Sequence, residues 1–132
     1  MSYCKILIID DDTDDVEILA DAFTQSGVDC VHYVHTAIQA FMYLEQIEKD
    51  EDLPKLIVTD LYLPGITGRE FLADLKGMER YKHIHVIVLS GLKSESEIQS
   101  YKAMGAADYL VKPNSYQEYL QVAKDISSRL AL

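Results

Sequence analysis

The sequence lacks a long apolar run. Charged or polar residues interrupt its apolar stretches well before the ~18 consecutive residues that a membrane-spanning helix needs. The first twelve residues, MSYCKILIIDDD, hold one lysine and become acidic after a short apolar stretch, which is not the pattern of a secretory signal peptide. We therefore expect a cytoplasmic protein that does not enter a membrane.

Basic residues are scarce. Lys and Arg number 12 against 22 Asp and Glu, so the net charge is −10, and nucleic acid would be repelled. The chain of 132 residues has the size of one domain, spanning 1–132, and at this length it buries roughly two-thirds of its unfolded surface. We expect one self-sufficient core and no DNA-binding output domain.

Cysteine is rare as well: the sequence has two, Cys4 and Cys30. Without a secretory signal, free thiols in a reducing compartment are the default expectation. The two residues can lie on neighbouring strands, so the sequence leaves a disulfide open.

Two kinds of cofactor motif are missing. No glycine pattern for binding a nucleotide phosphate is present, so no nucleotide is expected to bind directly. The four histidines have no cysteine or carboxylate neighbours at the spacing of structural zinc sites, so we interpret them as strand and loop residues. They are His32, His35, His83 and His85.

Five short apolar runs are present, and a helical pattern follows each one. Most runs are continuous stretches of aliphatic residues rather than alternating ones, which is typical of strands buried on both faces of a parallel sheet. Right-handed crossovers then give a three-layer α/β sandwich, (βα)5, with helices on both faces. The runs are 5–9, 30–34, 56–59, 86–89 and 109–111.

Helix boundaries are marked by caps and glycines. Asp12 or Thr13 can cap the first helix, and a capping-box pattern of Ser or Thr followed by Glu or Gln three residues later opens the other four. Glycines stand where three helices should stop. The last helix carries apolar residues at the spacing of one buried face. The boxes begin at Thr36, Thr67, Ser94 and Ser115, the glycines are Gly27, Gly77 and Gly105, and the stripe is Tyr116, Tyr119, Leu120, Ala123, Ile126 and Leu130.

Polar residues stand where four of the predicted strands end. Asp10 and Asp11 follow the first strand, Asp60 the third, Ser90 the fourth and Lys112 the fifth. Ligands of open parallel sheets bind outside this carboxyl edge, where the winding reverses. The sequence therefore predicts one pocket that holds three carboxylates, a hydroxyl and an ammonium group.

The predicted pocket suits phosphoryl chemistry. Three carboxylates repel one another, so we expect a hard cation, and an incomplete cage of oxygen ligands favours Mg²⁺. An aspartate beside a metal can act as a nucleophile toward phosphorus. Lys112 and Ser90 would neutralise and hydrogen-bond the phosphoryl oxygens.

Four stretches resemble the receiver domains of bacterial two-component response regulators, at the expected spacing from end to end of the chain. The resemblance implies a flavodoxin-like sheet in the order 2-1-3-4-5, for which a member of this family is a standard example. The stretches are ILIIDDD (6–12), IVTDLYLPGITG (57–68), VIVLSG (86–91) and GAADYLVKP (105–113).

Roles at the metal follow from the resemblance by position. Asp60, in TDLYLPG, matches the phosphoacceptor. Asp10 and Asp11 match the acidic pair that holds Mg²⁺, and the backbone carbonyl of Tyr62 is implied as a further ligand.

The resemblance also implies the parts of a switch. Ser90 takes the place of the hydroxyl residue and Lys112 that of the lysine that contacts the phosphoryl group, which makes these two catalytic together with the acceptor. Tyr109 matches the aromatic whose rotation reports activation. Gly91 matches the small residue that leaves the phosphoryl path open, and Pro113 is typically joined to the lysine by a cis peptide bond.

The function implied is that of a stand-alone response regulator, which is not an enzyme on an external substrate. A sensor histidine kinase or a histidine phosphotransfer protein would donate the phosphoryl group, and a downstream protein would bind the phosphorylated form. The domain would promote its own labelling and its own dephosphorylation. A monomer or a weak homodimer is expected.

Two other functions remain open at this stage: a small Mg²⁺-dependent phosphohydrolase using Asp60 or Asp10, and a scaffold that is never phosphorylated. An EF-hand is excluded, because its sixth position would be Asp15 where glycine is needed. A haloacid-dehalogenase-type phosphatase would need threonine at position 14, which is Asp14.

Residues near the site carry two further expectations. Asp12, Asp14 and Asp15 are expected in the first helical turn as solvated carboxylates that suit the helix dipole, with recognition of a partner protein as the alternative. Tyr62 and Leu92 match positions that flank the path of attacking water, and neither is a base for that water. A long-lived phosphorylated state is therefore expected.

Overall fold

The computed structural model describes residues 3–91 and 94–132. Strands and helices alternate along it, and each predicted strand is present with bounds shifted by at most one residue at either end. Within this described part, no helix combines the length and apolar character needed to cross a membrane. The strands are β1 (Ile6–Ile9), β2 (Val31–Val34), β3 (Leu56–Thr59), β4 (His85–Ser90) and β5 (Asp108–Val111). The helices are α1 (Thr13–Gln25), α2 (Ala37–Glu45), α3 (Gly68–Lys76), α4 (Glu95–Ala103) and α5 (Tyr116–Arg129), with a short 3-10 helix at Asp50–Asp52 between α2 and β3.

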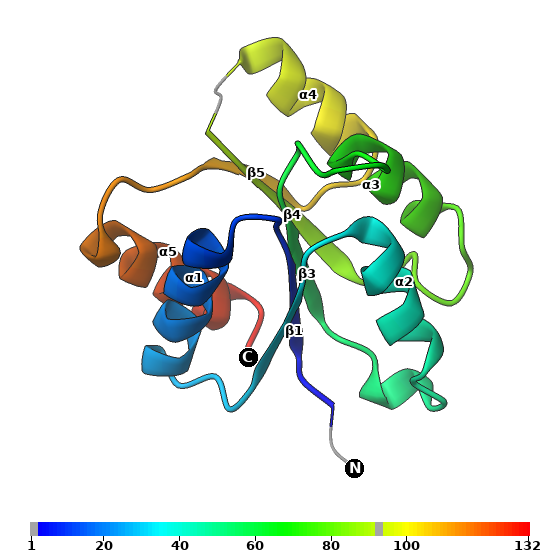
Figure 1. Cartoon of the computed structure of the whole chain (residues 1–132), viewed down its shortest axis with the longest axis horizontal. Coiled ribbons are helices and arrows are strands. Elements are labelled where there is room, and N and C mark those ends of the chain that lie inside the picture. Colours follow the sequence, from blue (N-terminus) through cyan, green and yellow to red (C-terminus); the bar gives the residue numbers. More distant parts are fainter. Residues whose placement is uncertain (1–2, 92–93) are drawn as a thin grey trace.

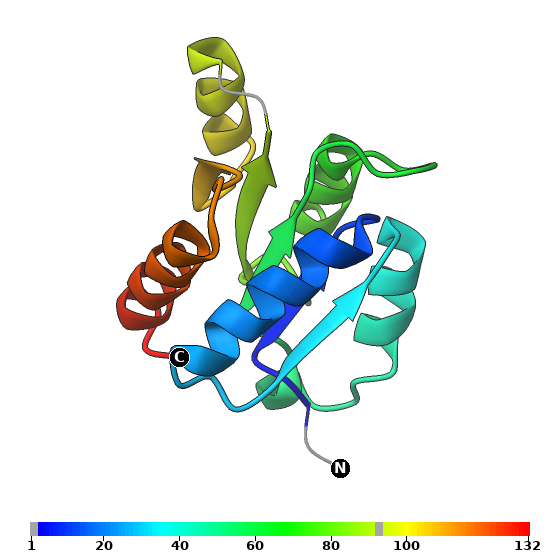
Figure 2. The same cartoon turned by 60° about the vertical axis from the view of Figure 1, so that its left-hand side comes forward.

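The five strands form one parallel sheet in the order β2-β1-β3-β4-β5, as expected. All strand arrows point to the same end, where α1 begins (Figures 1 and 2). The register aligns Ile9, the last residue of β1, with Thr59, the last residue of β3. The residues that follow these two strands therefore start side by side.

Two apolar layers enclose the sheet, which confirms the three-layer sandwich. Alternate residues of β1 enter different layers: Ile6 and Ile8 pack with α1 and α5, whereas Leu7 and Ile9 pack with α2 and α3. Figure 1 shows α1 and α5 together on one side of the sheet and α2 and α3 on the other. All four of these strand residues are at most 1% exposed, which is why the run is apolar at every position.

The predicted helix starts are mostly confirmed. Asp12 caps α1 by accepting from the backbone N–H groups of Asp14 and Asp15, and Thr67 forms a complete capping box at α3. Thr36 and Ser115 accept from the N–H three residues on, as expected.

The fourth capping box is only partly confirmed. Ser94 is the N-cap residue of α4, as predicted, but its side chain makes no capping hydrogen bond. Its hydroxyl lies 3.0 Å from that of Ser96.

The predicted helix-ending glycines and the predicted buried stripe on α5 are each confirmed in part. Gly27 and Gly105 have positive φ, which a side chain would disfavour. Gly77 ends α3 with a φ of −83°, so no left-handed conformation is needed there. The stripe on α5 is buried at Tyr119 but not at Tyr116, which is 41% exposed. The Tyr116 hydroxyl donates to a carboxylate of α1.

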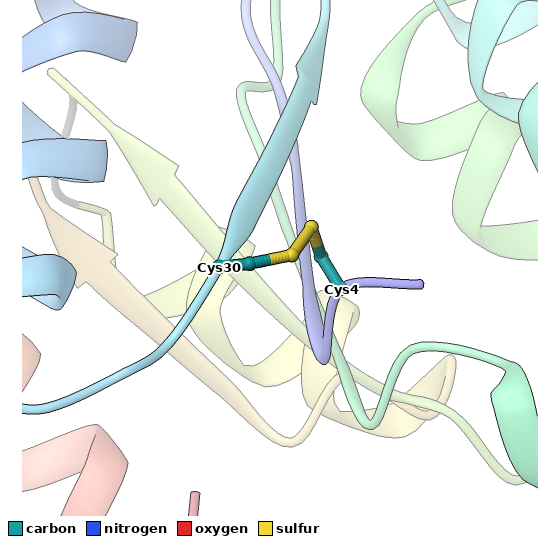
Figure 3. The surroundings of a disulfide bond; sticks show 2 residues. All are labelled: Cys4 and Cys30. Atoms are coloured by element: carbon teal, nitrogen blue, oxygen red, sulfur yellow. A yellow bond between two sulfur atoms is a disulfide. The ribbon is translucent and has the colours of Figure 1, made fainter. Parts of the chain in front are cut away.

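Cys4 and Cys30 form a disulfide, so the default expectation of free thiols is wrong for this structure. Cys4 lies just before β1 and Cys30 just before β2, and these strands pair directly (Figure 3). Their Cα atoms are 5.1 Å apart, a normal distance for a bridge. The bond ties the edge strand of the sheet to its neighbour.

Candidate functional site

The site lies at the carboxyl edge of the sheet, and the backbone ladder extends one residue beyond the strands to build it. Asp60 donates its N–H to the carbonyl of Ile9 at 3.0 Å, and Lys112 donates its N–H to the carbonyl of Ser90 at 2.7 Å. Asp10 is tied to β2 in the same way. These bonds fix where each side chain starts, so the convergence predicted from strand ends is confirmed for Asp10, Asp60 and Lys112.

The Lys112 ammonium group stands among three carboxylates. It donates to Oδ2 of Asp15 at 2.8 Å and to Oδ2 of Asp60 at 3.1 Å, and its Nζ lies 3.1 Å from Oδ2 of Asp10. Burial alone would lower the pKa of Lys112, but the hydrogen bond to Asp15 and the charges of Asp10 and Asp60 outweigh it and raise the pKa. The side chain therefore stays a cation at neutral pH.

Asp10, Asp11 and Asp60 form a compact carboxylate group. Each can offer an oxygen such that the three atoms lie within 4.8 Å of one another. Burial raises the pKa of Asp10, and the charge of Asp60 adds to the rise, while the N–H of Asp12 and the ammonium of Lys112 oppose it. Asp10 and Asp60 are buried and Asp11 is exposed. Like charges this close favour a bound cation, and oxygen-only ligands fit a hard divalent ion that keeps some of its water.

Two residues outside the carboxylate group, His35 and Gly68, pack against the backbone of Asp10 and Asp60. The Nδ1–H of His35 donates to the backbone carbonyl of Asp10 at 3.0 Å, because a carbonyl can only accept. Gly68, the first residue of α3, packs so closely that a Cβ there would collide with the carbonyl oxygen of Asp60. Larger residues at position 68 would therefore displace Asp60.

Ser90 and Tyr109 lie together on the side of the site toward α4. Ser90 is fully buried and Tyr109 is 5% exposed. Burial raises the pKa of the Tyr109 phenol, and a hydrogen bond with the Ser90 side chain opposes the rise. The phenol also donates weakly to Glu97 of α4 at 3.5 Å. The pair thus connects the end of β4 to α4.

The remaining predicted residues surround the opening of the site. Tyr62 donates its N–H to Oδ1 of Asp60 at 3.4 Å, and its side chain is 60% exposed. Among the described residues other than Gly91 and its chain neighbours, no atom lies within 4 Å of where a Cβ on Gly91 would stand. The peptide bond before Pro113 is trans, which corrects the expected cis bond; trans is the lower-energy form of an X–Pro bond. Leu92 lies outside the described residues.

The sequence interpretation missed two contributors. Asp15 was expected to be solvated, yet its carboxylate makes the shortest contact to Lys112 and is only 30% exposed. The sequence places a carboxylate at position 15, in the turn after Asp10 and Asp11. It does not indicate that this carboxylate pairs with Lys112, which is 97 positions away. His35 gave no signal beyond its place one residue past β2.

The fold and the site define a class: a doubly wound α/β domain whose carboxyl edge carries an acidic metal pocket and a lysine. The response regulator receiver domain model matches residues 6–124, and the chain belongs to this family. Receiver domains are signalling modules that bind a divalent metal ion, and they interact with histidine kinases or phosphotransfer proteins and with downstream targets.

Relatives of similar length support this assignment. The chain is 29% identical to the two-component response regulator ORR8 of Oryza sativa subsp. indica, over 96% of this chain and 100% of the relative. It is 29% identical to the phosphorylated cyanobacterial phytochrome response regulator RcpA, with a TM-score of 0.84 over 98% of this chain and 95% of that one. The response regulator Rcp1, solved with Mn²⁺ bound, is 27% identical with a TM-score of 0.76, over 93% and 91% of the two chains.

Proposed function

We propose that this chain is a stand-alone, phosphorylation-controlled binding protein in which Asp60 accepts the phosphoryl group. The donor is a phosphohistidine on a sensor histidine kinase or on a phosphotransfer protein of the cytoplasm. One observation carries the proposal: the Asp60 carboxylate, 10% exposed, lies 3.1 Å from the Lys112 ammonium and beside the carboxylates of Asp10 and Asp11. A nucleophile, a cation and a metal pocket are thus in one place.

The transfer uses one carboxylate oxygen of Asp60 as the nucleophile. That oxygen forms a bond to phosphorus as the P–N bond breaks, and the electron pair of that bond leaves with the imidazole nitrogen of the donor. Lys112 is close enough to Asp60 to hydrogen-bond a phosphoryl oxygen there. The Ser90 hydroxyl, at the end of the neighbouring strand, supplies a second donor.

Mg²⁺ is the proposed metal, held by the carboxylates of Asp10, Asp11 and Asp60 with the backbone carbonyl of Tyr62 as a further ligand. When bound, it would neutralise charge on the phosphoryl oxygens. The donor set fits, because three carboxylate oxygens within 4.8 Å leave room for water in an octahedral shell.

A path from the site to a binding surface runs through Ser90 and Tyr109. A phosphoryl group that recruits the Ser90 hydroxyl competes with the hydrogen bond between Ser90 and Tyr109. Tyr109 also contacts Glu97, so a change in its position is transmitted to α4. We propose that a downstream protein reads this change.

Incubation with acetyl phosphate tests the proposed function against a phosphohydrolase. The protein should gain the mass of one phosphoryl group per chain, with Mg²⁺ required, and the label should be labile to acid and to hydroxylamine. Continuous release of phosphate in many turnovers without a detectable labelled chain would instead indicate a phosphohydrolase. The absence of both labelling and phosphate release would indicate a scaffold.

Metal binding should be weak and should depend on both Asp10 and Asp11. The pair supplies charge but not a full cage, so water must complete the coordination. In a Mg²⁺ titration, the Asp10→Ala/Asp11→Ala variant should lose the saturable response of wild type. An Asp74→Ala variant, which removes an exposed carboxylate on α3, should keep it. A double variant that titrates like wild type would contradict this assignment.

The phosphorylated state should decay slowly. Tyr62 and Leu92 have no group that orients water in line, since a phenol is a poor general base and leucine has no polar atom. The Tyr62→Asn/Leu92→Glu variant should therefore lose the label about tenfold faster, which corresponds to ~1.4 kcal/mol of barrier. The measurement is the decay of label in Mg²⁺ after the donor is removed, and equal rates would show that these positions do not control water.

A further inference from the structure

Asp15 stands out because it contacts the site lysine from outside the metal pocket. Its carboxylate lies 2.8 Å from Lys112 Nζ, closer than Asp10 or Asp60 at 3.1 Å. It is also the most exposed of the three, at 30% against 8% and 10%. The backbone of Asp15 is fixed in the first turn of α1, where its N–H donates to the capping side chain of Asp12.

The other two carboxylates that contact Lys112, those of Asp10 and Asp60, are also candidate metal ligands. Asp10 and Asp60 belong to the carboxylate group that fits a divalent cation, and a cation there would compete with the lysine for their oxygens. An ammonium group has three hydrogens to donate, and it needs an acceptor that the metal does not claim. Asp15 is that acceptor, because it lies outside the three carboxylates of the metal pocket.

We infer that Asp15 is a positioning residue for phosphoryl transfer: it anchors Lys112 beside Asp60 when the metal binds Asp10 and Asp60. The inference builds on the proposed function and adds a residue to it. With one hydrogen of the ammonium held by Asp15, the remaining two point back toward the place where the phosphoryl oxygens arrive. Asp15 itself touches neither the phosphoryl group nor the metal.

The direction of the change in labelling rate distinguishes a positioning role of Asp15 from a purely electrostatic one. Acetyl phosphate is an anion, so removing a carboxylate near the site reduces repulsion and should speed labelling. Loss of an anchor for Lys112 should slow it. Asp15→Asn should therefore label about fivefold more slowly at saturating Mg²⁺, the scale of one lost charge-assisted hydrogen bond.

Asp14→Asn is the matched control. It removes the same charge from the same helical turn, but Asp14 is exposed and is not one of the three carboxylates around Lys112. Its labelling should equal or exceed that of wild type. Asp15→Glu, which restores the charge on a longer side chain, should recover part of the rate lost in Asp15→Asn.

A second readout follows Lys112 directly in the metal-free protein. A buried ammonium held by carboxylates exchanges its protons slowly enough to give a nitrogen-15 NMR signal. That signal should be present in wild type and Asp14→Asn, and broadened or shifted in Asp15→Asn.

These measurements distinguish two failures. If wild type takes up no label, the proposed function fails, while the NMR comparison still decides whether Asp15 holds Lys112. If Asp15→Asn labels as fast as Asp14→Asn, or if its Lys112 signal matches wild type, the anchoring role is overturned. Slower labelling together with a changed Lys112 signal supports it.

Discussion

Asp60→Asn should take up no acid-labile phosphoryl group from acetyl phosphate under conditions that label wild type fully. The substitution keeps the shape of the side chain, and the one oxygen that remains can accept from either the N–H of Tyr62 or the ammonium of Lys112, which contact different oxygens of Asp60. It removes the charged oxygen that attacks phosphorus, and a neutral amide oxygen is a far weaker nucleophile. The expected effect is therefore complete loss of label without loss of the fold.

A matched variant makes this result specific. Asp74→Asn changes the same functional group on the exposed side of α3 and should label like wild type. Thermal unfolding of both variants checks that the fold is intact. Hydroxylamine-sensitive label on Asp60→Asn would contradict the assignment of the acceptor.

Reduction of the disulfide between Cys4 and Cys30 should lower the free energy of unfolding by about 3 kcal/mol. A bridge across 26 positions removes conformational freedom mainly from the unfolded chain, and a loop of this length predicts a loss of roughly that size. The measurement is denaturant unfolding of the oxidised protein with and without dithiothreitol. The midpoint should fall in the presence of the reductant.

The Cys4→Ser/Cys30→Ser variant provides the control. It should unfold like the reduced protein and should not respond to dithiothreitol. Labelling of Asp60 should persist in it, because the bridge precedes β1 and β2 while the site follows the opposite ends of the strands. Equal midpoints for oxidised and reduced wild type would show that the bridge adds no stability.

The fold was predictable because its signals are local. Continuous apolar runs such as 56–59 belong to strands buried on both faces, and β3 has those bounds with all four residues buried. Capping residues such as Asp12 and Thr67 act within four positions of the chain. Ser94 is the N-cap residue of α4 but its hydroxyl contacts that of Ser96 and makes no capping hydrogen bond.

The centre of the site was predictable from topology. Parallel strands place their carboxyl ends at one edge, so Asp10, Asp60 and Lys112 had to meet once their strands were known. Ser90 was placed in the pocket by its strand end, whereas the role of Tyr109 depended on the family resemblance, because a buried tyrosine is equally consistent with a core.

The contacts of Asp15 and His35 and the disulfide could not be predicted from the sequence, because each depends on how distant parts of the chain pack. Asp15 and Lys112 are 97 residues apart, and whether a carboxylate in a first helical turn faces solvent or a lysine depends on how α1 packs. His35 and Asp10 are 25 apart and meet through a ring nitrogen and a backbone carbonyl, a contact without a sequence motif. The disulfide depends on the register of β1 and β2.

Chemical trapping of the phosphorylated residue tests directly whether Asp60 accepts the phosphoryl group. Wild-type protein labelled with acetyl phosphate in Mg²⁺ is reduced with borohydride, which converts an aspartyl phosphate to homoserine, and its peptides are mapped by mass spectrometry. We expect homoserine at position 60 and intact aspartates at Asp10, Asp11 and Asp15. Homoserine at position 10 or 11, or no homoserine in protein incubated with the donor, would contradict this expectation.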